Sequence, residues 1–451
     1  MKKAIITILG MIGLPREGQE KAEYYLSDSL KVDFSLKKDR YTNMLPVLVD
    51  NFRDSYGAIE SIYTVDAKKT QSEVLVYENL DFKIEDSGFY ISNIEGESEA
   101  QYSFFLEKYN EVIEKYDRVI IDVSHGFRHL PILATVNMIM QNIKDSKKIE
   151  YIFFAKEIEK FSKYEIVDLK EYLDLANLSF MLSTFNQNYT VSSNIRFKNP
   201  LYREISKELA EFSHHFLSNS LKPLIEGNLI SKIIDNLEKL QKDKSVINFK
   251  HYIEDIVLHL EEIRQLKYDS EWEKLYKISK IMDKRGYQLN AITLLFEAIG
   301  FYCLESLSHI EIVGKRAKEY YGFIEKQKKP EHIYSSYTMT NQIRTLVKIQ
   351  DRFHVSDKRL FIGNDNIKNR IIEYLNDVNQ IAKFEKLLQD LEALRNNLAH
   401  GNSSRAIGDV KKSYQSYLSR FKDLCIDKDI FSTAKEFSKM SSIDRLNNKW
   451  S

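Results

Sequence analysis

The chain has 451 residues, and Lys plus Arg and Asp plus Glu both number 66, so the formal net charge is zero. This length exceeds one ordinary hydrophobic core and predicts two or three domains. The balanced charge excludes a protein held on nucleic acid by bulk positive charge, although it leaves room for a local basic site. The two cysteines form neither a CxxC motif nor the disulfide framework of a secreted protein.

The apolar segments carry no targeting or membrane signal. The run after Met1-Lys2-Lys3 ends at Gly10, and it is too short and too rich in β-branched residues for a signal peptide. No segment approaches 18 uninterrupted apolar residues. We therefore expect a cytoplasmic protein without a membrane-spanning helix.

Strand and helix patterns alternate through the first 185 residues. Runs of β-branched residues predict strands at 4–9, 59–65, 118–123 and 149–154, and a hairpin-like strand at 164–167. Apolar residues at helical spacing predict helices at 43–52, 97–116, 129–143 and 169–185. The alternation is typical of βαβ units and predicts a Rossmann-like domain with a parallel sheet at residues 1–185.

The composition changes after residue 185. Residues 186–199 are rich in Asn, Ser and Thr, and Pro200 closes the segment, so a linker and a connecting helix are placed at 186–225. The remaining apolar spacing is helical, with helices predicted at 201–219, 227–242, 247–265, 270–284, 287–307, 310–326, 339–353, 366–398 with a possible break, and 406–424. The expected fold class is α/β followed by all-α, with a helical domain at 226–451.

A polar cluster follows the strand at 118–123, with the sequence Ser124-His125-Gly126-Phe127-Arg128-His129. Ligands of open parallel sheets bind beyond the carboxyl ends of strands. The next helix starts near His129, so its free N–H groups would face an anion, and Gly126 lets the backbone approach a ligand closely. Phe127 would stack on a base or fill the core. The alternative is a plain strand-to-helix turn capped by Ser124.

A second cluster, Arg395-Asn396-Asn397-Leu398-Ala399-His400, ends a helical pattern at 378–398, and Gly401 predicts a left-handed cap. Asn396 shares a face with His400, whereas Arg395 lies roughly 140° around the helix from it. An imidazole that moves protons and a guanidinium that neutralises charge on phosphorus suit RNA cleavage by a 2′-hydroxyl without a metal. The alternative is a solvated helix end with an incidental histidine.

Two motifs resemble known families. Asp122-Val123-Ser124-His125-Gly126 resembles the D-x-[ST]-H-G signature of CRISPR-associated Rossmann-fold (CARF) sensor domains, with serine where threonine is commoner. Arg395 to His400 resembles the R-x4-6-H motif of HEPN ribonucleases. Residues 275–298 also look like the helical segment before the catalytic helix of that family. The ordered pair looks like an ancillary ribonuclease of type III CRISPR systems.

The resemblance implies that a cyclic oligoadenylate, a tetra- or hexa-adenylate, binds across a homodimer and switches on cleavage of single-stranded RNA. It implies no cofactor for cleavage, no membrane and no DNA partner. Residue by residue, it makes Ser124, His125, Gly126 and Gly10 ligand contacts, to which we add Phe127 and Arg128 from position and charge. Arg395 and His400 become catalytic, together with Asn396 on the same face as His400. Thr42, Asn43 and Thr64 are further ligand candidates.

Two other functions remain open. A sensor with a non-catalytic regulatory module would need a helix-turn-helix with a basic recognition helix, and the helical half has no such pattern. A sensor that also degrades its cyclic activator, a ring nuclease, would use Ser124, His125 and Arg128, the same residues that would bind it. We expect no metal site, because His214 and His215 point roughly 100° apart on a helix and no H-E-x-x-H motif or cysteine cluster occurs.

Overall fold

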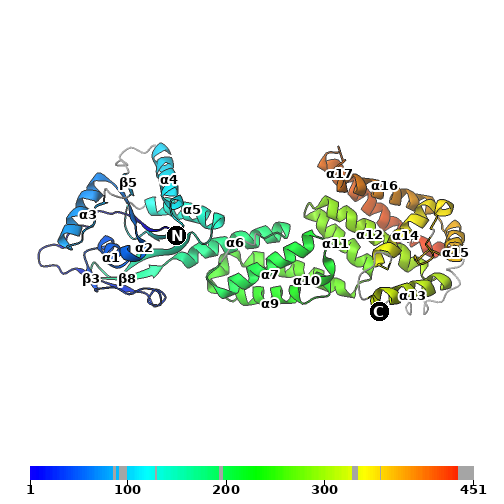
Figure 1. Cartoon of the computed structure of the whole chain (residues 1–451), viewed down its shortest axis with the longest axis horizontal. Coiled ribbons are helices and arrows are strands. Elements are labelled where there is room, and N and C mark those ends of the chain that lie inside the picture. The colour runs from blue at the N-terminus through cyan, green and yellow to red at the C-terminus, as the bar shows by residue number, and fades with distance from the viewer. Residues whose placement is uncertain are drawn as a thin grey trace. The chain divides into compact units, whose positions relative to one another are not determined.

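The computed structural model describes residues 1–84, 88–90, 99–126, 129–191, 197–327, 334–355 and 357–434. By its backbone contacts the chain divides into two compact units, which Figure 1 shows in chain colours. The first unit comprises Met1–Ser213 and Lys232–Val257, and the second comprises His214–Ser231 and Leu258–Ser451. Because the chain passes between the units more than once, no single residue separates them, and the domain limits at 185 and 225 stay predictions.

An eight-stranded sheet lies in the first unit, in the order β3-β2-β8-β7-β6-β1-β4-β5. The strands are β1 (Lys3–Ile8), β2 (Ala22–Leu26), β3 (Arg40–Tyr41), β4 (Ile59–Tyr63), β5 (Gly88–Tyr90), β6 (Arg118–Asp122), β7 (Ile149–Glu159) and β8 (Lys163–Asp168). The pairs from β7 through β6, β1 and β4 to β5 are parallel, whereas β8 is antiparallel to β7 and β3 is antiparallel to β2. The predicted α/β domain with a mainly parallel sheet is confirmed. β2, β3, β5 and the helix α3 (Val65–Tyr77) were not predicted from the sequence.

Helices cover both faces of this sheet (Figure 1). α1 (Met44–Asn51), α2 (Arg53–Tyr56) and α3 (Val65–Tyr77) contribute to the core that contains Ile5 and Ile120. α4 (Glu99–Glu114) and α5 (His129–Lys144) contribute to the opposite core, which contains Ile6 and Ile121. Successive side chains of a strand point to opposite faces, so the continuous apolar runs of β1 and β6 supply both cores.

The rest of the chain is helical, as predicted. The helices are α6 (Lys170–Asn188), α7 (Pro200–Leu217), α8 (Leu221–Ile225), α9 (Leu229–Leu240), α10 (Lys250–Gln265), α11 (Glu271–Lys284), α12 (Gln288–Leu307), α13 (Glu311–Lys326), α14 (Ser336–Ile349), α15 (Asp365–Asn376), α16 (Ile381–Ala399) and α17 (Ile407–Phe421). The suspected break within residues 366–398 lies between α15 and α16, where Gln380 has a φ of 60°. Both the break and the all-α character of the second half are therefore confirmed.

α12 is the core helix of the second unit and packs against α11, α14, α16 and α17. Within the described residues it is the one helix long and apolar enough to cross a membrane, but 61% of that stretch is buried in protein. A helix buried in a protein core can have the same length and apolar composition, so these two properties are weak evidence that α12 spans a membrane. Cys303 on α12 and Cys425 are both buried, and this burial raises the pKa of both thiols.

Candidate functional site

Three loops meet at the carboxyl ends of neighbouring strands β4, β1 and β6. Gly10 lies just after β1, Thr64 follows β4, and Ser124 lies just after β6. β1 is paired in parallel with both neighbours, with Ile8 opposite Ile62 and Thr7 opposite Asp122. The sheet thus brings the residues of the first predicted cluster to one edge, and it is the edge where ligands of open parallel sheets bind.

Two glycines allow the loops after β1 and β6 to touch. A Cβ atom built on Gly10 would lie 3.1 Å from both the backbone nitrogen of Gly126 and the Cβ of His125. Gly126 has a φ of +107°, and a Cβ atom there would lie 2.5 Å from the side chain of Ile8. A side chain at either position would push the loops apart, and the positive φ itself favours glycine. Gly10, His125 and Gly126 therefore lie together, while their contact with a ligand stays a prediction.

The Ser124 hydroxyl already makes two hydrogen bonds within the protein. Its hydroxyl donates to Oδ1 of the buried Asp122 at 2.5 Å and accepts a hydrogen bond from the backbone N–H of Ala155 at 2.8 Å. Thr7 Oγ1 donates to the other oxygen of Asp122 at 2.6 Å. The Ser124 hydroxyl thus joins the end of β6 to β7, and it would meet a ligand only through its remaining acceptor lone pair. The sequence analysis named Asp122 in the motif but gave it no role.

His125 holds the first turn of α1. Its Nε2 accepts a hydrogen bond from the backbone N–H of Met44 at 3.3 Å. Burial lowers the pKa of His125, although the Asp122 carboxylate and the backbone of Ser124 act in the opposite direction. An accepting ring nitrogen carries no proton, so this imidazole is neutral.

Two buried amides fix the loop after β1. Gln71 Nε2 donates to the carbonyl oxygens of Gly10 at 2.8 Å and Ile12 at 3.1 Å. Asn43 Nδ2 donates to Ile12 O at 2.8 Å and to Gln71 Oε1 at 3.0 Å, and its Oδ1 accepts the N–H of Leu45. The side chain of Asn43, a ligand candidate from the sequence, is therefore committed to shaping the loop and capping α1.

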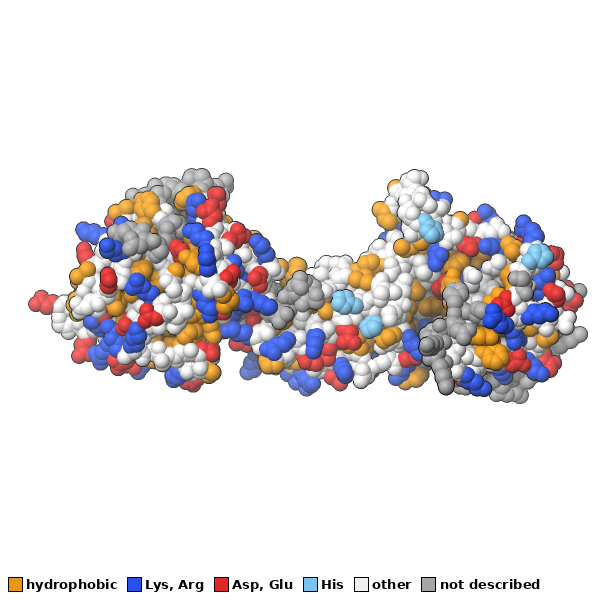
Figure 2. All heavy atoms as spheres, viewed as in Figure 1, with side chains coloured by type: hydrophobic (Ala, Val, Ile, Leu, Met, Phe, Trp, Pro, Cys, Tyr) orange, Lys and Arg blue, Asp and Glu red, His pale blue; other side chains and the backbone are white. Residues whose placement is uncertain are grey.

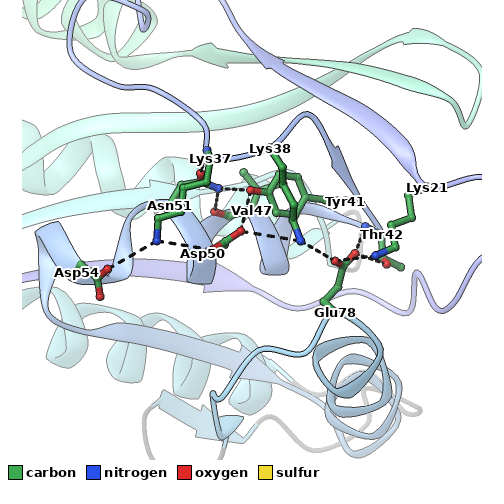
Figure 3. Close-up of polar contacts among 10 residues, drawn as sticks. All are labelled: Lys21, Lys37, Lys38, Tyr41, Thr42, Val47, Asp50, Asn51, Asp54 and Glu78. Atoms are coloured by element: carbon green, nitrogen blue, oxygen red, sulfur yellow. Dashed lines mark hydrogen bonds and ion pairs between the residues drawn. The ribbon is translucent and has the colours of Figure 1, made fainter.

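A charged network surrounds Thr42, just before α1 (Figure 3). The buried carboxylate of Glu78 accepts hydrogen bonds from Thr42 N at 2.8 Å, Thr42 Oγ1 at 2.7 Å, Lys21 Nζ at 2.9 Å and Lys38 Nζ at 3.1 Å. Burial raises the pKa of Glu78, but these hydrogen bonds outweigh burial and hold the pKa below its usual value. The backbone N–H and the hydroxyl of Thr42 are thus both bound to Glu78.

Thr64, the remaining ligand candidate, caps α3: its hydroxyl accepts the N–H of Ala67 at 3.3 Å.

Two residues of the predicted ligand site, Phe127 and Arg128, lie outside the described residues. α5 begins directly after them, at His129. Their roles stay predictions.

In the second unit, α16 ends at the other predicted cluster. His400 is the C-cap, and Gly401 has a φ of 67°. Gly401 N–H donates to Leu398 O at 3.2 Å, and Asn402 N–H donates to Asn397 O at 2.9 Å. These two bonds form a Schellman cap, so the predicted left-handed cap is confirmed. The His400 side chain is exposed on this cap.

Arg395 lies half-buried on α16. Its Nη1 donates to Asn396 Oδ1 at 2.9 Å, and its Cζ lies 5.8 Å from the ring centre of Phe296 on α12. Its Nε is buried and has no hydrogen-bond partner in the described part of the chain. Within that same part, no hydrogen bond joins Arg395 to His400, in agreement with their angular separation on the helix.

Arg344 on α14 is a second guanidinium on Phe296, and the sequence analysis missed it. Its Cζ lies 4.1 Å from the ring centre, and its Nη1 donates to Glu297 Oε2 at 2.8 Å and to Phe296 O at 3.1 Å. A Cβ atom on Gly300 would lie 2.5 Å from Arg344 Nη1, so this glycine makes room for the guanidinium. The available signal was Glu297 within the apolar run 294–304, because a partly buried carboxylate favours a cationic partner.

The face drawn in Figure 2 shows cationic and anionic side chains interspersed on both units, as expected from the balanced charge. Among the described residues, no group of three or more His, Cys, Asp or Glu side chains is placed to hold a metal ion. The side chains at the end of α16 supply an imidazole, a guanidinium and an amide.

The fold and these two clusters define the class: a Rossmann-like α/β domain with a glycine-lined corner at its strand ends, on one chain with a helical domain whose long helix ends in Arg395, Asn396 and His400. No known family model matches the chain. CRISPR-associated protein MJ1674 of Methanocaldococcus jannaschii is 24% identical to it over 304 residues, which are 64% of this chain and 45% of the relative. The predicted relationship to CRISPR-associated proteins is confirmed, although the match spans less than half of the relative's length.

A solved structure also matches, "Enterococcus italicus Csm6 bound to cyclic hexa-2′-fluoro-hexa-dAMP", over 99% of each chain. The sequence identity is 12% and the TM-score is 0.31. A likeness at this level adds no argument about either fold or function.

Proposed function

We propose that the protein is an endoribonuclease of type III CRISPR antiviral defence, activated by a cyclic oligoadenylate, and that it cleaves single-stranded RNA in the cytoplasm without a metal. One observation carries the proposal: a glycine-lined corner at the strand ends of the first unit and a helix end with Arg395 and an exposed His400 in the second occur on one chain. The CRISPR-associated relative supports the biological setting.

The corner suits a phosphate-bearing ring. Gly10 and Gly126 let the loops after β1 and β6 pack together, which gathers their backbone groups at the carboxyl ends of the strands, where ligands of open parallel sheets bind. α5, a helix of 16 residues, begins next to the corner, and the N-terminus of a helix favours an anion. The first two N–H groups of α1 are already taken by His125 and Asn43. The ligand would therefore depend on α5, on the loop backbone and on contact with His125.

The proposal includes a two-fold homodimer formed through α5. Four apolar side chains of this helix, spaced so as to share one face, are between 39% and 66% exposed: Ile132, Val136, Met140 and Ile143. A contiguous apolar stripe on a surface is typical of an interaction site. Because α5 starts at the corner, pairing two copies of α5 would bring two corners together. A ring with an even number of adenylates has a two-fold axis that matches such a dimer.

In the proposed reaction the 2′-hydroxyl of the RNA attacks the adjacent phosphorus and expels the 5′-oxygen of the next nucleotide. His400 moves the proton, and Arg395 stabilises the charge that builds on the phosphate oxygens. The product carries a 2′,3′-cyclic phosphate, or a 3′-phosphate after hydrolysis. In a dimer, two copies of His400 would divide the roles of acid and base.

The test is cleavage of a labelled single-stranded RNA by the pure protein, with cyclic tri-, tetra- and hexa-adenylate offered separately and with EDTA present. We expect one even-membered ring to activate cleavage, and EDTA to have no effect. A ring that binds without activating cleavage would favour the non-catalytic sensor, and disappearance of the ring itself would favour a ring nuclease. Loss of cleavage in EDTA would contradict the proposed chemistry.

A further inference from the structure

A pocket lies at the amino ends of strands β1, β6 and β7, the ends opposite the ligand corner. Its volume is about 620 Å³, within the usual range for small-molecule sites. Lys3 and Arg118, the first residues of β1 and β6, are paired in register and line it, and so does Glu150 near the start of β7. Gly10 and His125 follow the carboxyl ends of these same two parallel strands, so a strand length separates the two sites.

Cations outnumber carboxylates in this pocket. The cationic side chains that line it are Lys3, Arg118, Lys147, Lys170 and Lys198, and the carboxylates are Asp33, Glu150 and Asp174. Glu150 lies 3.7 Å from Lys3 Nζ and 3.5 Å from Arg118 Nε, so neither contact is a short hydrogen bond. One carboxylate thus serves two cations, which keep donors for another anion.

On the inner wall of the pocket, the charges of Lys170 and Asp174 neutralise each other. Lys170 is 2% exposed, and its Nζ donates to Asp174 Oδ1 and Asn142 Oδ1, both at 2.7 Å. The excess of positive charge therefore lies at the strand ends, with Lys3, Arg118 and the exposed Lys147.

Aromatic rings form another wall. Tyr151 donates its hydroxyl hydrogen to Asp33 Oδ2 at 2.8 Å, and Lys198 Nζ lies 3.9 Å from the centre of its ring. Phe34 packs edge-on against the same ring, with 5.0 Å between ring centres. Tyr151 thus presents a half-buried aromatic ring to the pocket, and aromatic rings are surfaces on which nucleobases stack.

We propose that this pocket binds a mononucleotide, with its phosphate against Lys3, Arg118 and Lys147 and its base beside Tyr151. A guanidinium and ammonium groups at one end are suited to a phosphate. The carboxylates of Asp33 and Glu150 accept hydrogen bonds, as ribose hydroxyls require. The site stands apart from the ring-binding corner and does not depend on the proposed ribonuclease activity.

The test is isothermal titration of the full-length protein with adenosine 5′-monophosphate, adenosine and inorganic phosphate in separate experiments. We expect the nucleotide to bind more tightly than either fragment. Arg118→Ala and Lys147→Ala should each weaken nucleotide binding by about tenfold, the loss of one charge-assisted contact. Lys147 is exposed, so its variant keeps the fold. Lys115→Ala, which removes an exposed cation outside the pocket, and His125→Ala, at the other edge of the sheet, should bind the nucleotide like wild type.

Three results would overturn the assignment. Inorganic phosphate that binds as tightly as the nucleotide would remove the role of the aromatic wall. Nucleotide binding that is lost in His125→Ala but kept in Lys147→Ala would place the nucleotide at the ring-binding corner instead. Absence of binding at about 1 mM nucleotide, a concentration that reveals even weak sites, would dismiss the pocket altogether.

Discussion

The backbone N–H of Met44 donates to Nε2 of His125, with 3.3 Å between the two nitrogen atoms. The start of α1 thus rests on the imidazole that follows β6, although the two residues lie 81 positions apart. Because only a neutral imidazole accepts this bond, the protonation state of His125 controls how α1 meets the proposed ligand corner.

The first prediction concerns the pH dependence of stability. Burial lowers the pKa of His125 in the folded protein below 6.5, so the unfolded chain takes up the proton first as the pH falls. The contribution of His125 is therefore complete above pH 6.5 and is lost as the pH falls below it. Compared with His125→Asn, which keeps an acceptor but does not titrate, wild type should lose about 1 kcal/mol more stability on acidification. Thermal melting between about pH 8 and pH 5 measures this difference. Equal curves for His125→Asn and wild type would refute the prediction.

The second prediction concerns the network in Figure 3. Glu78→Gln should cost about 1–3 kcal/mol, because Lys21 and Lys38 lose the charge that they share. The lowered pKa of Glu78 means that its contribution is present above the ordinary value of 4.5 and is lost as the pH falls through the folded value. Urea unfolding at neutral pH measures the cost. Glu73→Gln, on the exposed side of α3, is the matched control and should change little.

The third prediction separates two neighbouring amides at the proposed catalytic centre. Asn396 accepts a hydrogen bond from Arg395, whereas the exposed side chain of Asn397 shares no such bond in the described part of the chain. Asn396→Ala should lower the cleavage rate by an order of magnitude or more, and Asn397→Ala should leave it near wild type. His400→Ala and Arg395→Ala should lower it by about a hundredfold or more. The readout is single-turnover cleavage of RNA, with melting curves to show that every variant is folded. Comparable rates for the two Asn variants would remove Asn396 from the centre.

The fourth prediction compares two helical glycines. Gly300→Ala should destabilise the second unit and slow RNA cleavage, because its Cβ would displace Arg344 from Phe296, the ring that Arg395 also contacts. Gly322→Ala on α13 meets nothing within 4 Å and should instead stabilise the protein by about 0.5–1 kcal/mol, since alanine is the better helix former. Chemical denaturation of both variants gives the two signs, and stabilisation by Gly300→Ala would mean that Arg344 moves at no cost.

The fifth prediction tests the shared centre. Wild-type chains co-expressed with differently tagged His400→Ala chains give a mixed dimer that can be purified through both tags. If two copies of His400 act on one phosphate, the mixed dimer should cleave far below half the wild-type rate. Cleavage at half the rate would mean that each chain works alone.

The sequence predicted the elements whose patterns are long or uniformly apolar. β1 and β6 are continuous apolar runs, and the helices after residue 200 have clear helical spacing. β2 alternates between buried and half-buried residues over only five positions, and β3 has two residues, so neither pattern rises above the background. α3 was missed because its sequence, VDAKKTQSEVLVY, has few apolar residues and begins within the apolar run assigned to the preceding strand.

The ligand corner was predictable only in part. The motif marked the position of Ser124 to Gly126, but it could not tell that the Ser124 hydroxyl is already engaged by Asp122 and Ala155. That arrangement depends on the pairing of β6 with β7, and a local sequence motif does not specify which strands pair. The same holds for Arg344, which reaches Glu297 from a helix 47 residues further along the chain.

The rate at which the two buried cysteines react reports the opening of the second unit alone. Cys303 and Cys425 both belong to the second unit, and their raised pKa values leave almost no thiolate to react while that unit is closed. Labelling by a maleimide should therefore proceed only as fast as the second unit opens, and it should be blind to local opening of the first. A cysteine introduced on the surface could then carry a dye without removal of the native pair, because the native thiols would stay silent on the timescale of labelling.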